Sequence, residues 1–136
     1  MTKVYIDENF AKQLADGLDV FQQHLNFKER SNFKVISLKE KFGQGATDEE
    51  WIPIIGKEKG VVITQDLRIQ TTKHQYELYK KYELGVFFFK PPSHGYSFWE
   101  MVEQIINRWP EIKKKTKNKR PFAFRCKSRG RLEELK

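Results

Sequence analysis

The sequence predicts an α/β fold, a three-layer α/β/α sandwich in which helices cover both faces of a mainly parallel central sheet. The clearest observation is the apolar run Val61-Val62-Ile63, which follows a glycine and ends at Thr64. A strand without polar positions must be covered on both faces, as in a buried parallel sheet. The second observation is that segments with helical spacing separate such strands, which favours right-handed crossovers. At 136 residues, the chain is expected to form a single domain, residues 1–136, around one core.

Short apolar segments are expected to form the sheet. Four of them lie at residues 4–6, 33–38, 60–64 and 86–89, and two prolines end the fourth. Two later segments, residues 121–126 and 131–135, flank a Ser-Arg-Gly sequence and are expected to form a short hairpin or added edge strands.

The first helix is expected from about residue 9 to residue 24, with Asn9 as its cap. Its apolar stripe consists of Phe10, Leu14, Leu18, Phe21 and Leu25, which recur at spacings of three and four residues. Gly17 lies inside this pattern and costs about 1 kcal/mol relative to alanine.

The later helices have recognisable starts. Thr47 and Glu50 have the spacing of a capping box, and the inward positions of that helix are Asp48, Trp51, Ile52 and Ile55. Another helix begins at Thr71 or Thr72. The last helix starts with a second capping box, formed by Ser97 and Glu100. Its apolar stripe consists of Phe98, Met101, Val102, Ile105, Ile106 and Trp109, and Pro110 is expected to end it.

Positive charge is concentrated near the C-terminus. The chain has 26 Lys and Arg against 18 Asp and Glu, and residues 113–131 contain ten basic residues and no acid. Such a local excess suits a polyanion, so the basic segment 113–136 is expected to supply affinity for a nucleic-acid backbone. The candidate RNA-binding residues are Lys113, Lys114, Lys115, Lys117, Lys119 and Arg120. A solvated arm, or a contact with an acidic segment of a partner, is the alternative.

Cysteine content and the N-terminus bear on the compartment. The single Cys126 excludes an internal disulfide framework and a zinc site built on paired thiolates, and it favours a reducing compartment. The first residues lead into a strand without a long apolar run, so neither a signal peptide nor a membrane contact is expected. The expected location is the cytoplasm.

Three aspartates are expected to meet at one end of the sheet. Asp7 follows the first strand, Asp66 follows residues 60–64, and Asp48 begins a helix. The carboxyl ends of parallel strands form the usual ligand-binding crevice. A cation would neutralise three acids gathered there, and all-oxygen ligands suit Mg²⁺ or Mn²⁺. Such a metal can activate water against a phosphodiester. The alternative for each acid is a helix cap or a favourable interaction with a helix dipole.

These motifs resemble the PIN-like ribonucleases, in particular the small branch that includes the VapC-type toxins of bacterial and archaeal toxin–antitoxin pairs. The resembling residues, within roughly residues 3–90, are Asp7-Glu8-Asn9, Asp48-Glu49-Glu50-Trp51 and Val62-Ile63-Thr64-Gln65-Asp66. The resemblance implies a PIN-like fold and metal-dependent cleavage of RNA. It also implies a small antitoxin as partner, and a homodimer as one assembly, since relatives are often dimers.

Carried over residue by residue, Asp7, Asp48 and Asp66 match the metal-binding catalytic acids, and Thr64 matches the hydroxyl beside them. Glu8 and Glu49 are supporting candidates. Relatives often have another acid shortly after the third one, whereas this chain has Arg68 in that region. Arg68 is expected to hold a substrate phosphate or to pair with Glu8 or Glu49.

Two functions therefore stay open. One is a metal-dependent endoribonuclease, the toxin of a toxin–antitoxin pair, with one or two metals. The other is a non-catalytic RNA- or protein-binding module that kept the PIN-like fold after losing an acid.

Overall fold

The central element of the fold is a six-stranded sheet with the order β2-β1-β3-β4-β5-β6. The structure is a computed structural model that describes residues 1–7 and 9–135. Strands β1 to β5 are parallel, and β6 pairs antiparallel with β5. The strands are β1 (Thr2–Ile6), β2 (Phe33–Ser37), β3 (Val61–Thr64), β4 (Gly85–Phe89), β5 (Phe122–Cys126) and β6 (Glu133–Glu134).

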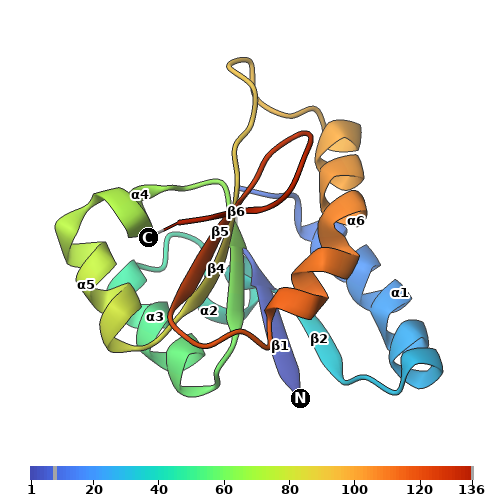
Figure 1. The fold of residues 1–136 in the computed structure, drawn as a ribbon, viewed down its shortest axis with the longest axis horizontal. Helices are drawn as coiled ribbons and strands as arrows, with labels where there is room; N and C mark the ends of the chain where they lie inside the picture. Colours follow the sequence, from blue (N-terminus) through green and yellow to red (C-terminus); the bar gives the residue numbers. More distant parts are fainter. Residues whose placement is uncertain (8, 136) are drawn as a thin grey trace.

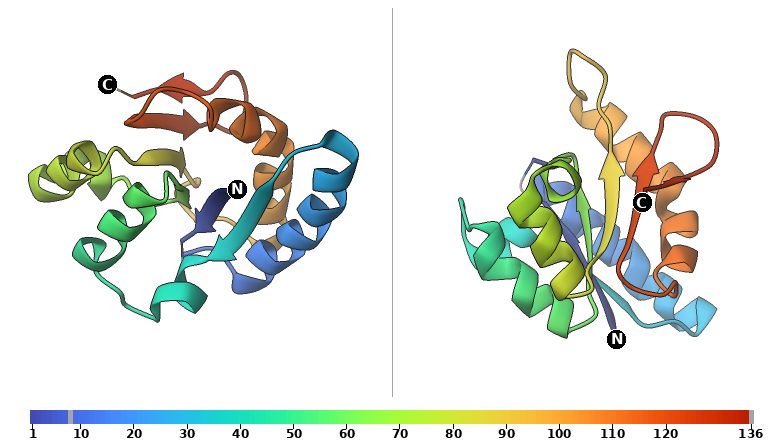
Figure 2. Two further views of the ribbon diagram at one scale, coloured as in Figure 1. Left: turned by 90° about the horizontal axis from the view of Figure 1, so that it is seen from below. Right: turned by 60° about the vertical axis from the view of Figure 1, so that its left-hand side comes forward.

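Helices cover both faces of this sheet, as the end-on view in Figure 2 shows. One face carries α1 (Lys12–Glu29) and α6 (Phe98–Lys115). The other carries α2 (Leu38–Phe42), α3 (Asp48–Lys57), α4 (Arg68–Thr71) and α5 (Lys73–Lys81). The predicted three-layer α/β/α sandwich is therefore confirmed, and so is the C-terminal hairpin of edge strands.

Alternating side chains of the strands build two cores. On β1, Val4 and Ile6 pack toward α1 and α6, whereas Tyr5 packs toward the helices of the opposite face. All four residues of β3 are buried, because helices cover both of its faces. This burial confirms the prediction for residues 61–64, made from the absence of polar positions.

The sheet has two distinct ends, which we call the carboxyl edge and the amino edge. All five parallel strands end at the carboxyl edge, which is the upper end of the sheet in Figure 1; the N-terminus lies at the lower end. The loops at residues 90–97 and 127–132 project from this upper end, and the connection at residues 116–121 crosses the lower end. Strands of five residues at about 3.3 Å each separate the two edges by roughly 16 Å.

The first helix differs from its prediction. It begins at Lys12 with Ala11 as N-cap, not at Asn9, and it continues to Glu29. Phe21 is 60% exposed, and Gln22 occupies the buried face in its place. Gln22 is kept there because its side-chain oxygen accepts a 2.9 Å hydrogen bond from the Trp109 indole.

The capping predictions gave one success and one failure. Ser97 and Glu100 form a full capping box at the start of α6. Thr47 is the N-cap of α3, but its side chain makes no cap hydrogen bond, so the predicted capping box with Glu50 does not form. Pro110 does not end α6, which continues to Lys115. Ile105, Trp109 and Ile112 are buried on either side of the proline, and this packing holds the helix together across it.

The short helices α2 and α4 were not predicted. The sequence indicated a strand that ends at residue 38 and a loop at residues 42–46, and no element for residues 68–70. Within residues 1–7 and 9–135, no helix has the length and apolar character required to cross a membrane.

Candidate active site

The carboxyl edge brings Asp7 and Asp66 together through Thr64. Neighbouring β1 and β3 align Ile6 with Ile63, and the Asp7 amide donates to the Ile63 carbonyl at 2.9 Å. The Thr64 hydroxyl donates to Asp7 Oδ2 at 2.6 Å and accepts a hydrogen bond from the Asp66 amide at 3.0 Å. Thr64 is 1% exposed. Its hydroxyl therefore fixes both acids, and Thr64 is more than an ordinary strand residue.

Asp48 reaches the same place from the first turn of α3. Trp51, Ile52 and Ile55 follow it on the buried face of the helix and are at most 3% exposed, so they fix where α3 begins. The three aspartates line one pocket of about 230 Å³. The other residues of this acid pocket are Asn9, Leu38, Lys39, Gly43, Ala46, Trp51 and Arg68.

The acids influence one another electrostatically. Burial raises the pKa of the Asp48 carboxyl above its usual value, and the negative charge of Asp66 raises this pKa further. Burial also acts to raise the pKa of Asp66, but hydrogen bonds from Arg68 outweigh it and lower that pKa. Two carboxylates of one pocket are thus shifted in opposite directions, a feature frequent at functional sites.

Arg68 is the cation that causes this difference. Its guanidinium Nε lies 3.0 Å from Asp66 Oδ1 and 2.8 Å from Oδ2, and its backbone amide donates to Oδ1 at 3.0 Å. The predicted pairing of Arg68 with Glu49 is wrong, because Glu49 pairs with His74 at 2.8 Å. Glu8, the other expected partner and supporting candidate, lies outside the described residues.

The donor chemistry of the acid pocket fits a hard divalent cation. Carboxylate oxygens from Asp7, Asp48 and Asp66 point to Mg²⁺ or Mn²⁺. Within residues 1–7 and 9–135, however, no three Asp, Glu, His or Cys side chains stand close enough together to hold a metal ion. Arg68 occupies both oxygens of Asp66. A metal bound through Asp66 would have to compete with this guanidinium.

Of the pocket residues that were not among the predicted site residues, Asn9 and Lys39 are the two with polar side chains. Asn9 belongs to the Asp7-Glu8-Asn9 motif, and its carbonyl accepts a 3.0 Å hydrogen bond from Gln65, which ties the end of β1 to the end of β3. Lys39 comes from α2, a helix that the sequence did not indicate. Only the motif could have identified Asn9, and no local signal identified Lys39.

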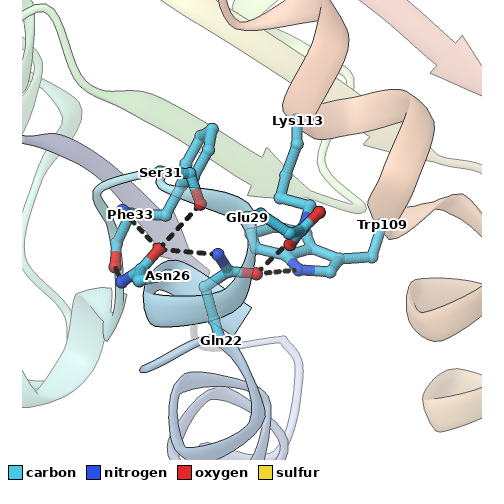
Figure 3. A network of polar contacts seen from close by, with 7 residues as sticks. All are labelled: Gln22, Asn26, Glu29, Ser31, Phe33, Trp109 and Lys113. Carbon is cyan, nitrogen blue, oxygen red and sulfur yellow. Dashed lines mark hydrogen bonds and ion pairs between the residues drawn. The ribbon is translucent and has the colours of Figure 1, made fainter. Parts of the chain in front are cut away.

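The basic residues 113–120 lie at the amino edge, across the sheet from the acid pocket. Figure 3 shows Lys113 inside a polar network: its ammonium lies 2.8 Å from Glu29 and 3.2 Å from Gln22. Lys115 stacks over Phe124, and Arg120 donates to the Gly60 carbonyl at 2.7 Å. These three residues have intramolecular partners, so the surface cations of this segment are Lys114, Lys117 and Lys119.

The comparisons with known proteins give one family. Residues 2–91 match the family model described as a PIN like domain, which is more than half of the chain. Neither the curated proteins nor the solved structures include a significant match.

Proposed function

The chain belongs to the PIN-like domain family, and from this premise we propose that it is a metal-dependent endoribonuclease that hydrolyses phosphodiester bonds of RNA. Membership of this family indicates a nuclease-type function. The observation that carries the proposal is the convergence of Asp7, Asp48 and Asp66 on one pocket at the carboxyl edge. In α/β sheets this edge is where ligands bind.

The roles follow from the contacts of each residue. Asp7, Asp48 and Asp66 would have to draw closer together, with Arg68 displaced from Asp66, to hold Mg²⁺ or Mn²⁺. Such an ion would supply an activated water and stabilise the charge that develops on the attacked phosphate. Thr64 fixes the Asp7 carboxylate through a 2.6 Å hydrogen bond. Glu49, paired with His74 beside the pocket, supports the start of α3. Arg68, once displaced from Asp66, could bind a substrate phosphate.

The proposal extends to the biological role of the protein, its location and its partners. By the resemblance of its motifs to VapC-type toxins, the protein would be the toxin of a toxin–antitoxin pair in the cytoplasm, neutralised by a small antitoxin protein. A homodimer is the assembly that the resemblance favours. The exposed Lys114, Lys117 and Lys119 would contribute affinity for RNA.

A second candidate function has a specific observation in its favour. The Arg68 guanidinium pairs with Asp66, so a protein cation already lies at one of the three acids that a nuclease would use for its metal. This arrangement suits a non-catalytic PIN-like module that binds RNA or a protein.

A cleavage assay separates the two functions. Single-stranded RNA is incubated with the protein in Mn²⁺ or Mg²⁺, with and without chelator, beside Asp7→Asn as the control variant. The ribonuclease proposal predicts cleavage that both the chelator and Asp7→Asn abolish. RNA that stays intact with either metal, in a preparation that melts cooperatively, refutes it and leaves the binding module.

A further inference from the structure

Cations gather at the amino edge, at the opposite end of the strands from Asp7 and Asp66. They come from three connections that each lead into a strand: α3 to β3, α5 to β4, and α6 to β5. The basic residues of these connections that line surface hollows are Lys57, Lys59, Lys81, Lys117, Lys119 and Arg120. Segments far apart in the sequence thus contribute to one basic surface.

This surface is hollowed. Two cavities of about 570 and 230 Å³ lie there, and Lys59, Glu83 and Arg120 line both of them. The shared residues show that the two cavities adjoin, and we call the combined feature the amino-edge groove. Arg120 is held in place between the two, because it donates to the Gly60 carbonyl and stacks on Phe122.

The groove keeps a net positive charge. Its acidic residues are Glu58 and Glu83. Glu58 already accepts a 2.7 Å hydrogen bond from Tyr5 and lies 3.5 Å from Lys3. Among the residues that the structure describes, Lys57, Lys59, Lys117 and Lys119 form no ion pair, and all four are exposed. Their charges are available to a partner.

The interaction with a helix dipole explains only some of the lysines on this surface. Lysine is favoured in the last turn of a helix because it interacts with the helix dipole. Lys57 and Lys81 are the last residues of α3 and α5 and fit that explanation. Lys59, Lys117 and Lys119 follow the helix ends, where this interaction is weaker.

We propose that the amino-edge groove is a second RNA-binding surface, which holds the phosphodiester backbone of single-stranded RNA away from the acid pocket. The choice of RNA as the polyanion rests on the proposed function. Because roughly 16 Å of sheet separates the groove from the acids, a long RNA can contact both and a dinucleotide cannot. The affinity for long RNA should therefore depend on the groove, even when the acid pocket neither binds nor cleaves the RNA.

The test measures binding of labelled polyuridylate by fluorescence anisotropy, in chelator, so that cleavage does not interfere. Lys59→Gln/Lys119→Gln is compared with Lys28→Gln/Arg30→Gln. The control pair removes the same charge from exposed positions near the amino edge that do not line the groove. Each phosphate contact contributes a slope of about −0.7 to the plot of log affinity against log salt. The groove variant should flatten this slope by about 1.4, and the control should leave it unchanged.

Equal slopes for the groove variant and wild type, with both proteins folded by thermal melting, would overturn the proposal. Competition with polyglutamate is the second arm: binding of the acidic peptide without binding of polyuridylate would identify a protein-docking surface and also overturn it. Absence of cleavage in metal, combined with the predicted loss of binding in chelator, would disprove the ribonuclease function while supporting this inference.

Discussion

The Arg68 guanidinium spans both carboxylate oxygens of Asp66, with its Nε 3.0 Å from Oδ1 and 2.8 Å from Oδ2. This contact places a protein cation at the acid pocket, where the family resemblance leads us to expect a metal cation. The arginine side chain is 69% exposed, so solvent weakens the attraction and the guanidinium can leave. Arg68 would therefore compete with a metal ion bound through Asp66.

Replacing Arg68 should tighten metal binding. An exposed ion pair contributes roughly 0.2–1 kcal/mol, so Arg68→Gln should lower the Kd for Mn²⁺ by up to about fivefold. Isothermal titration calorimetry measures this Kd without reference to activity. Lys73→Gln, which removes an exposed cation that does not line the pocket, should leave the Kd unchanged. An identical Kd for wild type and Arg68→Gln would show that the arginine does not compete.

Two aspartates of the pocket should respond oppositely to neutralisation in the metal-free protein. The pKa of Asp48 is raised above 3.8 by burial and by the charge of Asp66. This raised pKa favours folding at a pH below the pKa of the unfolded chain, where the carboxyl is protonated. The benefit is lost as the pH rises through the pKa of the folded protein. At neutral pH, Asp48→Asn should therefore melt higher than wild type.

Neutralising Asp66 should have the opposite effect on stability. Arg68 lowers its pKa below 3.8, so its contribution is present above the unfolded pKa and is lost as the pH falls through the folded pKa. Asp66→Asn should be less stable than wild type at neutral pH by up to about 1 kcal/mol, and the gap should close in acid. Thermal melts in chelator across this pH range check both variants, and shifts of the same sign would contradict the assigned electrostatics.

The sequence predicted the strands and the acid pocket because their signals are local. Asp7 and Asp66 each follow an apolar strand, and parallel pairing of β1 with β3 then brings them together. The third acid was predictable for the same reason, since the buried residues Trp51, Ile52 and Ile55 set the position of Asp48 on α3.

The features that the sequence did not predict depend on distant partners. Gln22 is buried because Trp109, on another helix, donates to it. Pro110 stays inside α6 because tertiary packing outweighs one lost backbone hydrogen bond. The pairing of Arg68 with Asp66, rather than with a glutamate, depends on the turn after β3, whose geometry the sequence does not specify.

Two adjacent lysines at the end of α6 should have different roles, one in stability and the other in RNA binding. The Lys113 side chain is 12% exposed and bonds to Glu29 and Gln22 (Figure 3). The Lys114 side chain is exposed. Lys113→Gln should lower the free energy of unfolding by about 1 kcal/mol. Lys114→Gln should change that free energy by less than about 0.5 kcal/mol.

The same two variants should differ in salt dependence. Lys114→Gln should flatten the slope for polyuridylate by about 0.7, and Lys113→Gln should not alter it. Urea denaturation and anisotropy titrations measure the two properties. A change in slope for Lys113→Gln alone would reverse this assignment.

The Thr64 hydroxyl should matter for both stability and metal binding. It is buried, donates to Asp7 and accepts from the Asp66 amide, so valine removes both hydrogen bonds while keeping a β-branched shape. Each hydrogen bond that is lost costs roughly 0.5–1.5 kcal/mol, so the two together contribute about 1–3 kcal/mol. Thr64→Val should lower the free energy of unfolding by an amount in this range.

The valine should also weaken Mn²⁺ binding by about 10–100-fold, the usual effect of removing a group that orients a metal ligand. Thr64→Ser is the matched control, because it keeps the hydroxyl and loses only a methyl group. Serine should retain the affinity for Mn²⁺ even where its stability falls. Calorimetry with both variants, each checked by urea denaturation, decides the role: if valine and serine bind Mn²⁺ equally, the hydroxyl supports the turn after β3 and does not orient Asp7 toward a metal.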